Sequence, residues 1–301
     1  MKTIKNMLYI AAMATAITAC SGEETLAPEA GTPITVSVTI PGDVWAVASR
    51  VAGETYSDWT LHYTDYKGDA ATYAPTVTEG NGTFSFTTDK NLVWEKIDAT
   101  KPIHLTCVTD NGTPSDDTDD YTLHVSVASA TPRQPLAFGA MKPTVAKFTV
   151  NFTLTTNNST DAVTIAFGAK GMADDYDPQA NNGAWPANDS EDVTGFGSSL
   201  VDTPAAGTRT VTGTILLPEQ EMGDELIVKY GSHNWIVDLS TVSVSSEQKA
   251  NQLKAGQHIT LNIKASYTSL NAPSIEIEAF EPASGYENDL GGEAQQPSTN
   301  S

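Results

Sequence analysis

The stretch Ile34-Thr35-Val36-Ser37-Val38-Thr39-Ile40 decides how this chain folds. Apolar residues stand at every second position, with Thr and Ser between them. Because successive side chains of a β-strand point to opposite faces, this pattern predicts a strand with one buried and one solvent-exposed face. Pro41-Gly42-Asp43 follows at once and ends the strand, since these residues favour turns.

The same alternation recurs along the rest of the chain. It is found in residues 83–87, 121–127, 148–154, 259–263 and 275–278. Helical periodicity is rare, and only residues 91–98 and 246–254 are expected to form about two turns each. Many short strands separated by turn sequences such as Asn81-Gly82 and Asn111-Gly112 predict an all-β chain built from β-sandwiches.

The length and pattern of the chain predict two such sandwiches. Residues 130–135 are poor in strand signal, and a long strand is expected after Pro143, so the boundary is placed near 130–144. We therefore expect an N-terminal sandwich at 33–135 and a C-terminal sandwich at 142–282.

Two polar segments are expected to lie outside the regular structure. Residues 171–208 are rich in Asp, Asn, Gly and Pro, and a loop of this length is usually functional or disordered. Residues 285–301 are polar and Gly-rich, which predicts a disordered tail.

Residues 1–19 are expected to form a signal peptide. Lys2 and Lys5 precede a mostly apolar run, Met7 to Ile17, which is too short to span a bilayer. The run ends in Ile17-Thr18-Ala19-Cys20, which resembles a bacterial lipobox. The alternative is an ordinary signal peptide that contains a cysteine by chance. If the resemblance holds, Cys20 is the first mature residue and carries the acyl chains that anchor the protein in a membrane.

Residues 20–32 follow as a flexible tether. Its first residues, Ser21-Gly22-Glu23-Glu24, are similar to the surface-export signal of Bacteroidetes lipoproteins. The alternative is a tether that is merely polar.

The chain is strongly acidic, with a formal net charge of −21 at pH 7. This charge repels phosphate backbones, so we predict no nucleic-acid partner. It also repels anionic membrane surfaces, so the lipid on Cys20 is expected to hold the protein at the outer membrane. Cys107 is the one other cysteine. No intrachain disulfide is therefore available, and Cys107 is expected to be a small buried apolar residue.

The sequence lacks the common motifs for catalysis and cofactor binding. The chain has no Gly-rich phosphate loop, no His-Glu-x-x-His, no Cys-x-x-Cys and no Gly-x-Ser-x-Gly. Its histidines, His62, His104, His124, His233 and His258, are spread along the sequence. We therefore predict that the protein is not an enzyme and has no cofactor and no metal site.

Two acidic groups have an alternative interpretation. The turn Asp116-Asp117-Thr118-Asp119-Asp120 could bind calcium, but it lacks the spacing and the glycine of a calcium loop, so a charged turn is favoured. Glu276 and Glu278 would share one strand face, as a glycosidase pair could, but a solvated face is favoured.

Trp185 is the candidate contact residue. It lies in the polar stretch Asn181-Asn182-Gly183-Ala184-Trp185-Pro186. A tryptophan in such a loop can serve as a platform for a sugar or for a neighbouring subunit. The alternative, which we favour, is a loop that packs its one large side chain onto the sandwich.

Several stretches resemble the fimbrillin-type lipoproteins of Bacteroidales, the subunits of type V pili. In the N-terminal half these are residues 34–43, Ser49-Arg50 and Leu61-His62-Tyr63. In the C-terminal half they are residues 143–150, Ile215-Leu216-Leu217-Pro218, the predicted strand pair 226–230 and 234–239, and Leu253 to Ile263. His258 stands where the family usually has an aromatic residue.

This resemblance implies two tandem transthyretin-like Greek-key β-sandwiches in a lipid-anchored protein of the cell surface. It implies a role as a fimbrial subunit or anchor that partners other pilin subunits by β-strand exchange and supports adhesion to host or bacterial surfaces. In the family a trypsin-like protease cuts after an arginine of the N-terminal domain and the first strand is removed.

Arg50 is the candidate processing site, and the alternative is a surface arginine of no special role. Residues 34–40 would be the removed strand, and residues 275–280 are a candidate donor. An uncut chain would keep its lipid and act as an anchor or accessory subunit, whereas a cut chain would be a stalk or tip subunit.

Two other functions are alternatives to this one. A glycan-binding surface lipoprotein of a polysaccharide-uptake system would also combine a lipid anchor with β-sandwiches, with Trp185 as its ligand contact. An extracellular hydrolase is disfavoured by the missing motifs.

Overall fold

The computed structural model describes residues 31–40, 55–80, 83–110, 120–156, 161–180, 183–267 and 274–278. Within these ranges the chain consists of β-strands, their connections and two short 3-10 helices, η1 (Trp94–Lys96) and η3 (Gly197–Ser199). The all-β prediction is thereby confirmed. The same ranges contain no helix with the length and apolar character needed to cross a membrane.

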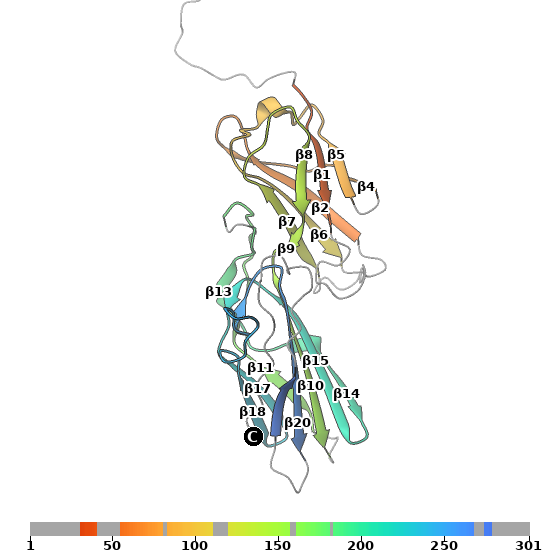
Figure 1. The fold of residues 1–301 in the computed structure, drawn as a ribbon, viewed down its shortest axis with the longest axis vertical. Helices are drawn as coiled ribbons and strands as arrows, with labels where there is room; N and C mark the ends of the chain where they lie inside the picture. The colour runs from red at the N-terminus through yellow and green to blue at the C-terminus, as the bar shows by residue number, and fades with distance from the viewer. Residues whose placement is uncertain are drawn as a thin grey trace, which may run out of the picture.

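The N-terminal part contains two sheets around a first hydrophobic cluster (Figure 1). One sheet has the strand order β4-β5-β1-β8 and the other has the order β3-β2-β6-β7-β9. The strands are β1 (Thr35–Thr39), β2 (Thr55–Thr64), β3 (Ala70–Tyr73), β4 (Thr78–Gly80), β5 (Thr83–Thr87), β6 (Ile103–Asp110), β7 (Tyr121–Val127), β8 (Leu136–Ala140) and β9 (Lys142–Pro143). Both sheets contribute alternate side chains to the cluster, for example Val36 of β1 and Leu105 of β6, as in a sandwich.

The C-terminal part contains a second cluster between a larger and a smaller sheet. The larger sheet has the order β14-β15-β10-β20-β21, the smaller has the order β11-β17-β18, and β12-β13 and β16-β19 form two-stranded ribbons. The strands are β10 (Ala146–Thr156), β11 (Val163–Ala166), β12 (Ala169–Met172), β13 (Ala187–Val193), β14 (Leu200–Ala205), β15 (Thr208–Leu217), β16 (Gln220–Glu221), β17 (Glu225–Tyr230), β18 (His233–Asp238), β19 (Gln252–Leu253), β20 (His258–Tyr267) and β21 (Ser274–Glu278).

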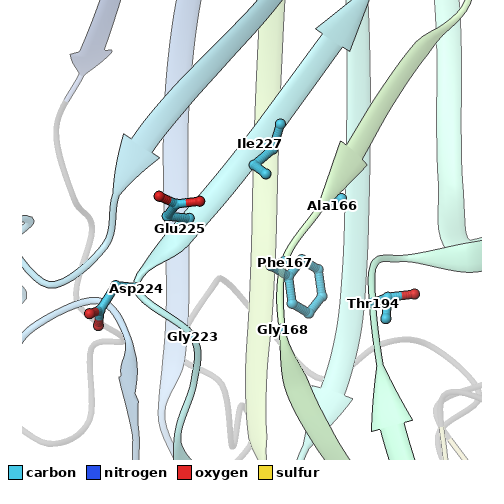
Figure 2. A pocket seen from close by; sticks show the side chains of 8 residues that line it. All are labelled: Ala166, Phe167, Gly168, Thr194, Gly223, Asp224, Glu225 and Ile227. Atoms are coloured by element: carbon cyan, nitrogen blue, oxygen red, sulfur yellow. The ribbon is translucent and has the colours of Figure 1, made fainter.

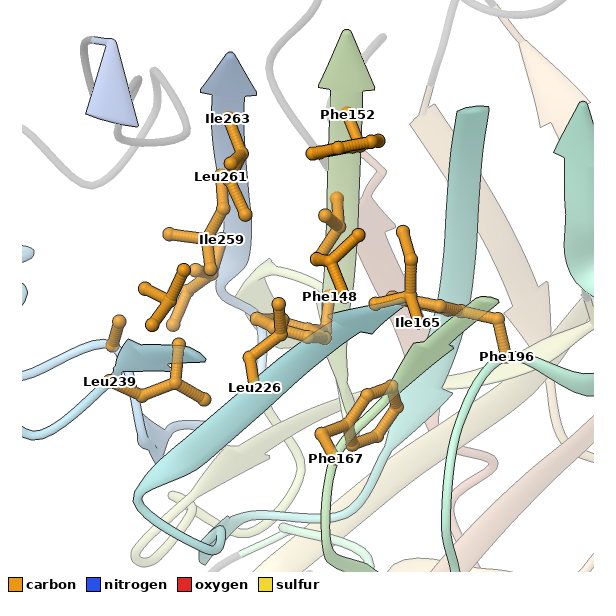
Figure 3. Packing of buried hydrophobic residues seen from close by; sticks show 14 of the residues in the cluster. Phe148, Phe152, Ile165, Phe167, Phe196, Leu226, Leu239, Ile259, Leu261 and Ile263 are labelled. Atoms are coloured by element: carbon orange, nitrogen blue, oxygen red, sulfur yellow. The ribbon is translucent and has the colours of Figure 1, made fainter. Parts of the chain in front are cut away.

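Aromatic and aliphatic side chains fill this second cluster. Figure 3 shows Phe148 and Phe152 of β10 beside Ile259, Leu261 and Ile263 of β20. Strands β10 and β20 run parallel in register, which places these side chains on one face of the larger sheet. The apolar residues of both strands therefore share one buried face of the sheet, as the alternation in residues 148–154 and 259–263 predicts.

The chain passes from one cluster to the other at a single peptide bond. Val145 belongs to the first cluster and Ala146, the first residue of β10, to the second. Strands β8 and β9 lie in the stretch where a boundary is expected, and both pair with strands of the N-terminal sheets. The domain limits 33–135 and 142–282 and the transthyretin-like topology stay predictions.

Three expectations about local structure were wrong. Residues 171–208 are not one loop, because β13, η3 and β14 lie within them. The ribbon strand β13 has no buried residue, so it lacks the apolar alternation that identifies a strand. Of residues 91–98 only η1 is helical. Residues 246–254 form turns and β19, and the side chains of Gln248 and Asn251 in these turns are buried and hydrogen-bonded.

Some predicted features lie outside the described residues. They are the signal peptide, the lipidation site Cys20, most of the tether, Arg50, both Asn-Gly turns, Asp116 to Asp119 and the tail 285–301. Cys107 is described and is fully buried, with its Sγ 3.8 Å from Met141 Sδ, which agrees with its expected role as an apolar core residue.

Gly213 marks a place where the second cluster tolerates no side chain. It lies on β15 opposite Val150 and Leu200, and an added Cβ would overlap the ring of Phe196. That ring stacks on Phe148 and meets Phe167 edge-on, with ring centroids 6.0 Å and 4.9 Å apart. Moving Phe196 would therefore disturb three packed aromatic side chains.

We predict that Gly213→Ala lowers the free energy of unfolding by about 1–3 kcal/mol, as overpacking of a filled core does. The measurement is urea denaturation followed by circular dichroism. The matched control is Gly139→Ala on β8, where a Cβ meets nothing within 4 Å. This control should change stability by less than about 0.5 kcal/mol. Equal effects of the two substitutions would contradict the packing argument.

Candidate functional site

The candidate site is the position of β1 within its sheet. β1 pairs antiparallel with β5, from Thr35↔Thr87 to Thr39↔Thr83, and parallel with β8, from Val36↔Leu136 to Thr39↔Ala140. The strand is therefore a central one, although it stands near the beginning of the chain. Its main chain uses its hydrogen-bonding groups toward neighbours on both sides.

The apolar face of β1 is completely buried. Ile34 and Val36 have no exposed surface, and Val38 and Ile40 are 2% exposed. All four belong to the first hydrophobic cluster. Burial of four aliphatic side chains stabilises the strand in its place by about 6–12 kcal/mol.

Polar contacts hold the entry to β1. The Ile34 N–H donates to Thr88 Oγ1 at 2.9 Å, the Thr88 N–H returns a bond to the Ile34 carbonyl at 3.0 Å, and Thr88 Oγ1 donates to the Leu92 carbonyl. One residue earlier, Pro33 forms a β-bridge with Val93. These bonds fix the register of the strand with respect to the segment that follows β5.

Glu95 of η1 adds a charged contact at the same end. Its Oε2 accepts from the Thr32 N–H at 2.8 Å, and its Oε1 accepts from Arg133, 3.0 Å from Nη2. The Thr32 N–H lowers the pKa of the Glu95 carboxyl, and the Arg133 guanidinium contributes in the same direction. The carboxylate therefore stays ionised in mildly acidic solution, and its contacts weaken when the pH falls through this lowered pKa.

The geometry has one chemical consequence. If β1 left its place, β5 and β8 would each present an unpaired strand edge, and between them would lie a groove lined by the first hydrophobic cluster. Unpaired edges of this kind accept an added strand. The only covalent link from β1 to the body of the chain is the segment of residues 41–54, which contains Arg50.

The candidate donor segment lies at the far edge of the larger C-terminal sheet. β21 pairs with β20 over five positions, from Asn262↔Glu278 to Ser266↔Ser274, and is the last strand in the order of that sheet. An edge strand is held by one neighbour, whereas β1 is held by two. Residues 279 and 280, the rest of the predicted donor, lie outside the described residues.

Trp185 lies against the first cluster although its neighbours in sequence belong to the C-terminal part. Its ring stacks on Tyr176, with centroids 4.6 Å apart and planes 10° apart, and its indole N–H donates to the Ala173 carbonyl at 2.8 Å. Its main-chain N–H donates to the Thr144 carbonyl at 2.9 Å. One ring face and the N–H are thus engaged within the chain. A role as a sugar or subunit contact stays a prediction.

The structure also brings together three histidines that are far apart in the sequence. His62 of β2, His104 of β6 and His124 of β7 lie on three adjacent strands, and His104 Nδ1 is 2.9 Å from His124 Nε2. Each histidine stands next in sequence to a buried leucine, so the alternation of the strand places it on the other face of the sheet. Only the register of the strands shows that the three histidines lie side by side. His233 and His258 lie on β18 and β20 of the C-terminal part.

A shallow open pocket lies beside β17 (Figure 2). Its lining is formed by Ala166, Phe167, Gly168, Thr194, Gly223, Asp224, Glu225 and Ile227. Asp224 accepts a hydrogen bond from Asn251 Nδ2 at 3.0 Å, and the Gly223 N–H donates to the Gly168 carbonyl. These polar groups therefore have structural partners. Among the described ranges, no group of three or more His, Cys, Asp or Glu residues could hold a metal ion.

Comparison with known proteins gave structural similarity alone. No protein-family model and no curated protein sequence matches the chain. Among solved structures, the fimbrial anchor protein Mfa2 from Porphyromonas gingivalis is 9% identical with a TM-score of 0.47, over 83% of this chain and 97% of that one. A fimbrial assembly protein from Parabacteroides distasonis is 9% identical with a TM-score of 0.38, over 84% of this chain and 99% of that one. At such identities and TM-scores, we draw the function from the residues of this chain itself.

We predict that Ile34→Ala lowers the free energy of unfolding by about 2–5 kcal/mol, because it leaves a cavity beneath β1. Thr39→Ala on the exposed face of the same strand is the matched control and should cost less than about 0.5 kcal/mol. Urea denaturation measures both. A small effect of Ile34→Ala would mean that β1 contributes little to the N-terminal part.

Proposed function

We propose that this chain is a surface lipoprotein that acts as a fimbrial subunit or as the anchor of a fimbrium. It associates with other pilin subunits by strand exchange at the β1 position and supports adhesion. The lipid on Cys20 holds the uncut chain at the outer membrane. The observation that carries the proposal is the central place of a strand whose apolar face is buried and whose covalent link to the body is one short segment.

A single cut at Arg50 would turn β1 into a separate peptide. The strand would then be held by hydrogen bonds and by its apolar face alone, so a competing strand could replace it. Such a competitor needs the same alternation of apolar and polar residues, because alternate side chains must enter the cluster. Residues 275–280 offer Ile275 and Ile277 at this spacing.

The same cut decides the place of the protein in the assembly. Cys20 lies on the N-terminal side of Arg50, so a cut chain that loses β1 also loses its lipid. It could then enter a polymer as a stalk or tip subunit. An uncut chain keeps both the lipid and the filled groove, which suits an anchor that lends a donor strand but accepts none.

Arg50 is a favourable site for an arginine-specific protease when compared with the two other arginines. Arg209 is 8% exposed and pairs with Asp202. Arg133 is exposed, but it lies between β7 and β8, where a cut leaves β1 attached to β2. Cleavage after Arg50 would therefore separate β1 from the rest of the chain, whereas cleavage after Arg133 would not.

We predict that a soluble chain beginning at Ser21, treated with an arginine-specific endoprotease, is cut after Arg50 and then takes up a fluorescent peptide of residues 33–41. Uptake follows because the peptide can fill the groove that the cut strand leaves. Mass spectrometry identifies the cut, and gel filtration measures the peptide that elutes with the protein.

Two controls make this test specific. Arg50→Ala should remain uncut between β1 and β2 and take up no peptide, and a peptide with Val36→Asp and Val38→Asp should not bind to the cut chain. A chain that is cut after Arg50, yet neither takes up the native peptide nor forms oligomers, would contradict strand exchange.

A further inference from the structure

Three histidines form a row on the outer face of the five-stranded N-terminal sheet. His62 stands opposite His104 in the β2–β6 register, and His104 Nδ1 lies 2.9 Å from His124 Nε2. His62 Nε2 lies 3.0 Å from Thr106 Oγ1. We call these three residues the histidine row. The contact between His104 and His124 requires one ring nitrogen to donate and the other to accept, so it cannot form when both rings are protonated.

A segment of the C-terminal part covers this row. It comprises residues 173–180 and 183–186 of the connection between β12 and β13, and we call it the docking segment (Figure 1). Gly183 has φ +86°, and an added Cβ would overlap the His124 ring, so the main chain passes directly over that imidazole. Two residues later, the Trp185 N–H bonds to the Thr144 carbonyl.

The docking segment is a compact unit. Tyr176 Oη donates to the Gly183 carbonyl at 2.9 Å and stacks on Trp185. Two hydrogen bonds close the segment at its base. The Trp185 indole N–H donates to the Ala173 carbonyl, and the Ala173 N–H donates to the Pro186 carbonyl. These contacts lie within the segment, so they do not depend on its contact with the sheet.

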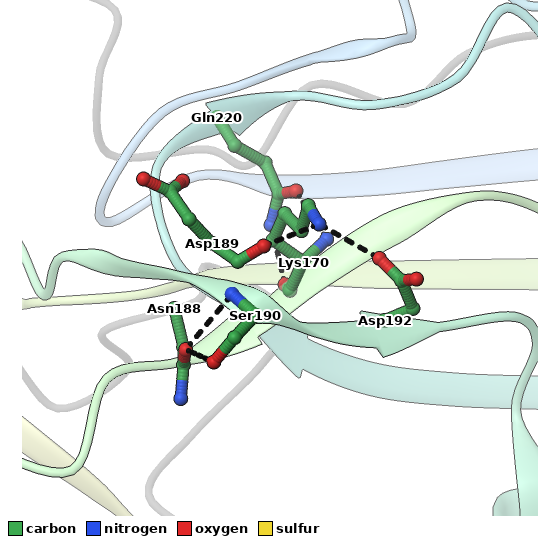
Figure 4. Close-up of polar contacts among 6 residues, drawn as sticks. All are labelled: Lys170, Asn188, Asp189, Ser190, Asp192 and Gln220. Atoms are coloured by element: carbon green, nitrogen blue, oxygen red, sulfur yellow. Dashed lines mark hydrogen bonds and ion pairs between the residues drawn. The ribbon is translucent and has the colours of Figure 1, made fainter.

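Its base is tied to the C-terminal part. Lys170 Nζ donates to the Asp189 carbonyl and to Asp192 Oδ1 at 2.6 Å and 2.7 Å, which joins β12 to β13 (Figure 4). The Lys170 main chain exchanges two bonds with the side-chain amide of Gln220 on β16. The ribbon therefore moves with the C-terminal part, and the contact of its tip with the histidine row joins the two parts.

The charges that face the row are few. Asp177 of the docking segment acts on His62 and His104 and favours their protonated forms. Lys142 of β9 stands opposite His124 in register and adds positive charge. Tyr176 stays neutral, since burial raises its pKa. Protonation of the row would thus place up to three cations beneath the segment, near one carboxylate and one ammonium group.

We propose that the docking segment and the histidine row form a pH-sensitive latch between the two parts of the chain, closed when the histidines are neutral and released when they become protonated. The proposal does not rest on strand exchange, because the latch lies on a different sheet from β1.

The direction follows from linkage. Burial, with the neighbouring histidines, lowers the pKa of His124 to about 4 in the docked state, from 6.5 when free, and burial also lowers the pKa of His62 and His104. The contribution of the neutral histidines to docking is therefore fully present above pH 6.5 and is lost as the pH falls from 6.5 toward 4. His124 alone shifts the equilibrium toward release by at most about 10-fold at pH 5.5 and about 80-fold at pH 4.5, the limits reached if its pKa returns fully to 6.5 on release.

The test is amide hydrogen exchange of the full mature chain, corrected for the intrinsic pH dependence. The protection of the Trp185 N–H should fall between pH 7.5 and pH 5.5, by up to about 10-fold from His124 alone, and recover when the pH is raised. The Thr144 N–H, which bonds to the Thr122 carbonyl within the N-terminal part, should keep its protection and serves as the internal reference.

Substitutions distinguish release caused by the histidine row from destabilisation of the whole protein by acid. The triple variant His62→Gln, His104→Gln, His124→Gln should lose the pH response, whereas His233→Gln on β18 should keep it. If the triple variant also loses Thr144 protection, His124→Gln alone replaces it and should reduce the fall. Unchanged Trp185 protection in the native chain between pH 7.5 and pH 4.5, or a full response in the triple variant with Thr144 still protected, would overturn the proposal.

Asp177→Asn gives a second, independent readout. The carboxylate favours the charged histidines in the docked state, so its removal should move the loss of Trp185 protection to higher pH. A shift to lower pH would contradict the assigned electrostatics.

Discussion

The N-terminal part depends on the burial of one strand between two neighbours. β1 and the residue on either side of it contribute four aliphatic side chains to the first cluster, and β1 pairs with β5 on one side and β8 on the other. Since β8 comes about a hundred residues later in the sequence, this pairing closes the sheet only after most of the N-terminal part has been made. The same closure leaves a strand that is central in space yet peripheral along the chain, and this is what makes its exchange physically possible.

The alternation of apolar residues was sufficient to predict most of the strands. Residues 34–40, 148–154 and 259–263 each have one face in a core, and a period of two is the direct result of that burial. β13 has no buried face, so nothing in its sequence distinguishes it from a loop. The short helices expected at 91–98 and 246–254 fail because turn-forming side chains such as Asp89 and Ser245 bond to the main chain there.

The candidate site was only partly accessible to sequence reasoning. That residues 34–40 form a buried strand follows from their own pattern, but the parallel partner β8 lies in residues 130–144, where a domain boundary was expected. The histidine row could not have been predicted, because adjacency of His62, His104 and His124 depends on the register of three strands and on the arrival of the docking segment. Trp185 has an ambiguous sequence environment, and only the structure shows Tyr176 stacked on its ring.

The histidine row and the β1 groove occupy opposite faces of the same sandwich, and this arrangement relates them. Leu61, Leu105 and Leu123 are fully buried in the cluster that β1 covers, and each is the neighbour in sequence of one histidine of the row. A donor strand that fills the volume of Ile34, Val36, Val38 and Ile40 leaves these leucines in place, and with them the row. A donor with smaller side chains would let the sheet shift, and the contact between Gly183 and His124 leaves little space for such a shift. Close packing of the incoming strand is therefore required for the two parts of the chain to keep their contact after exchange.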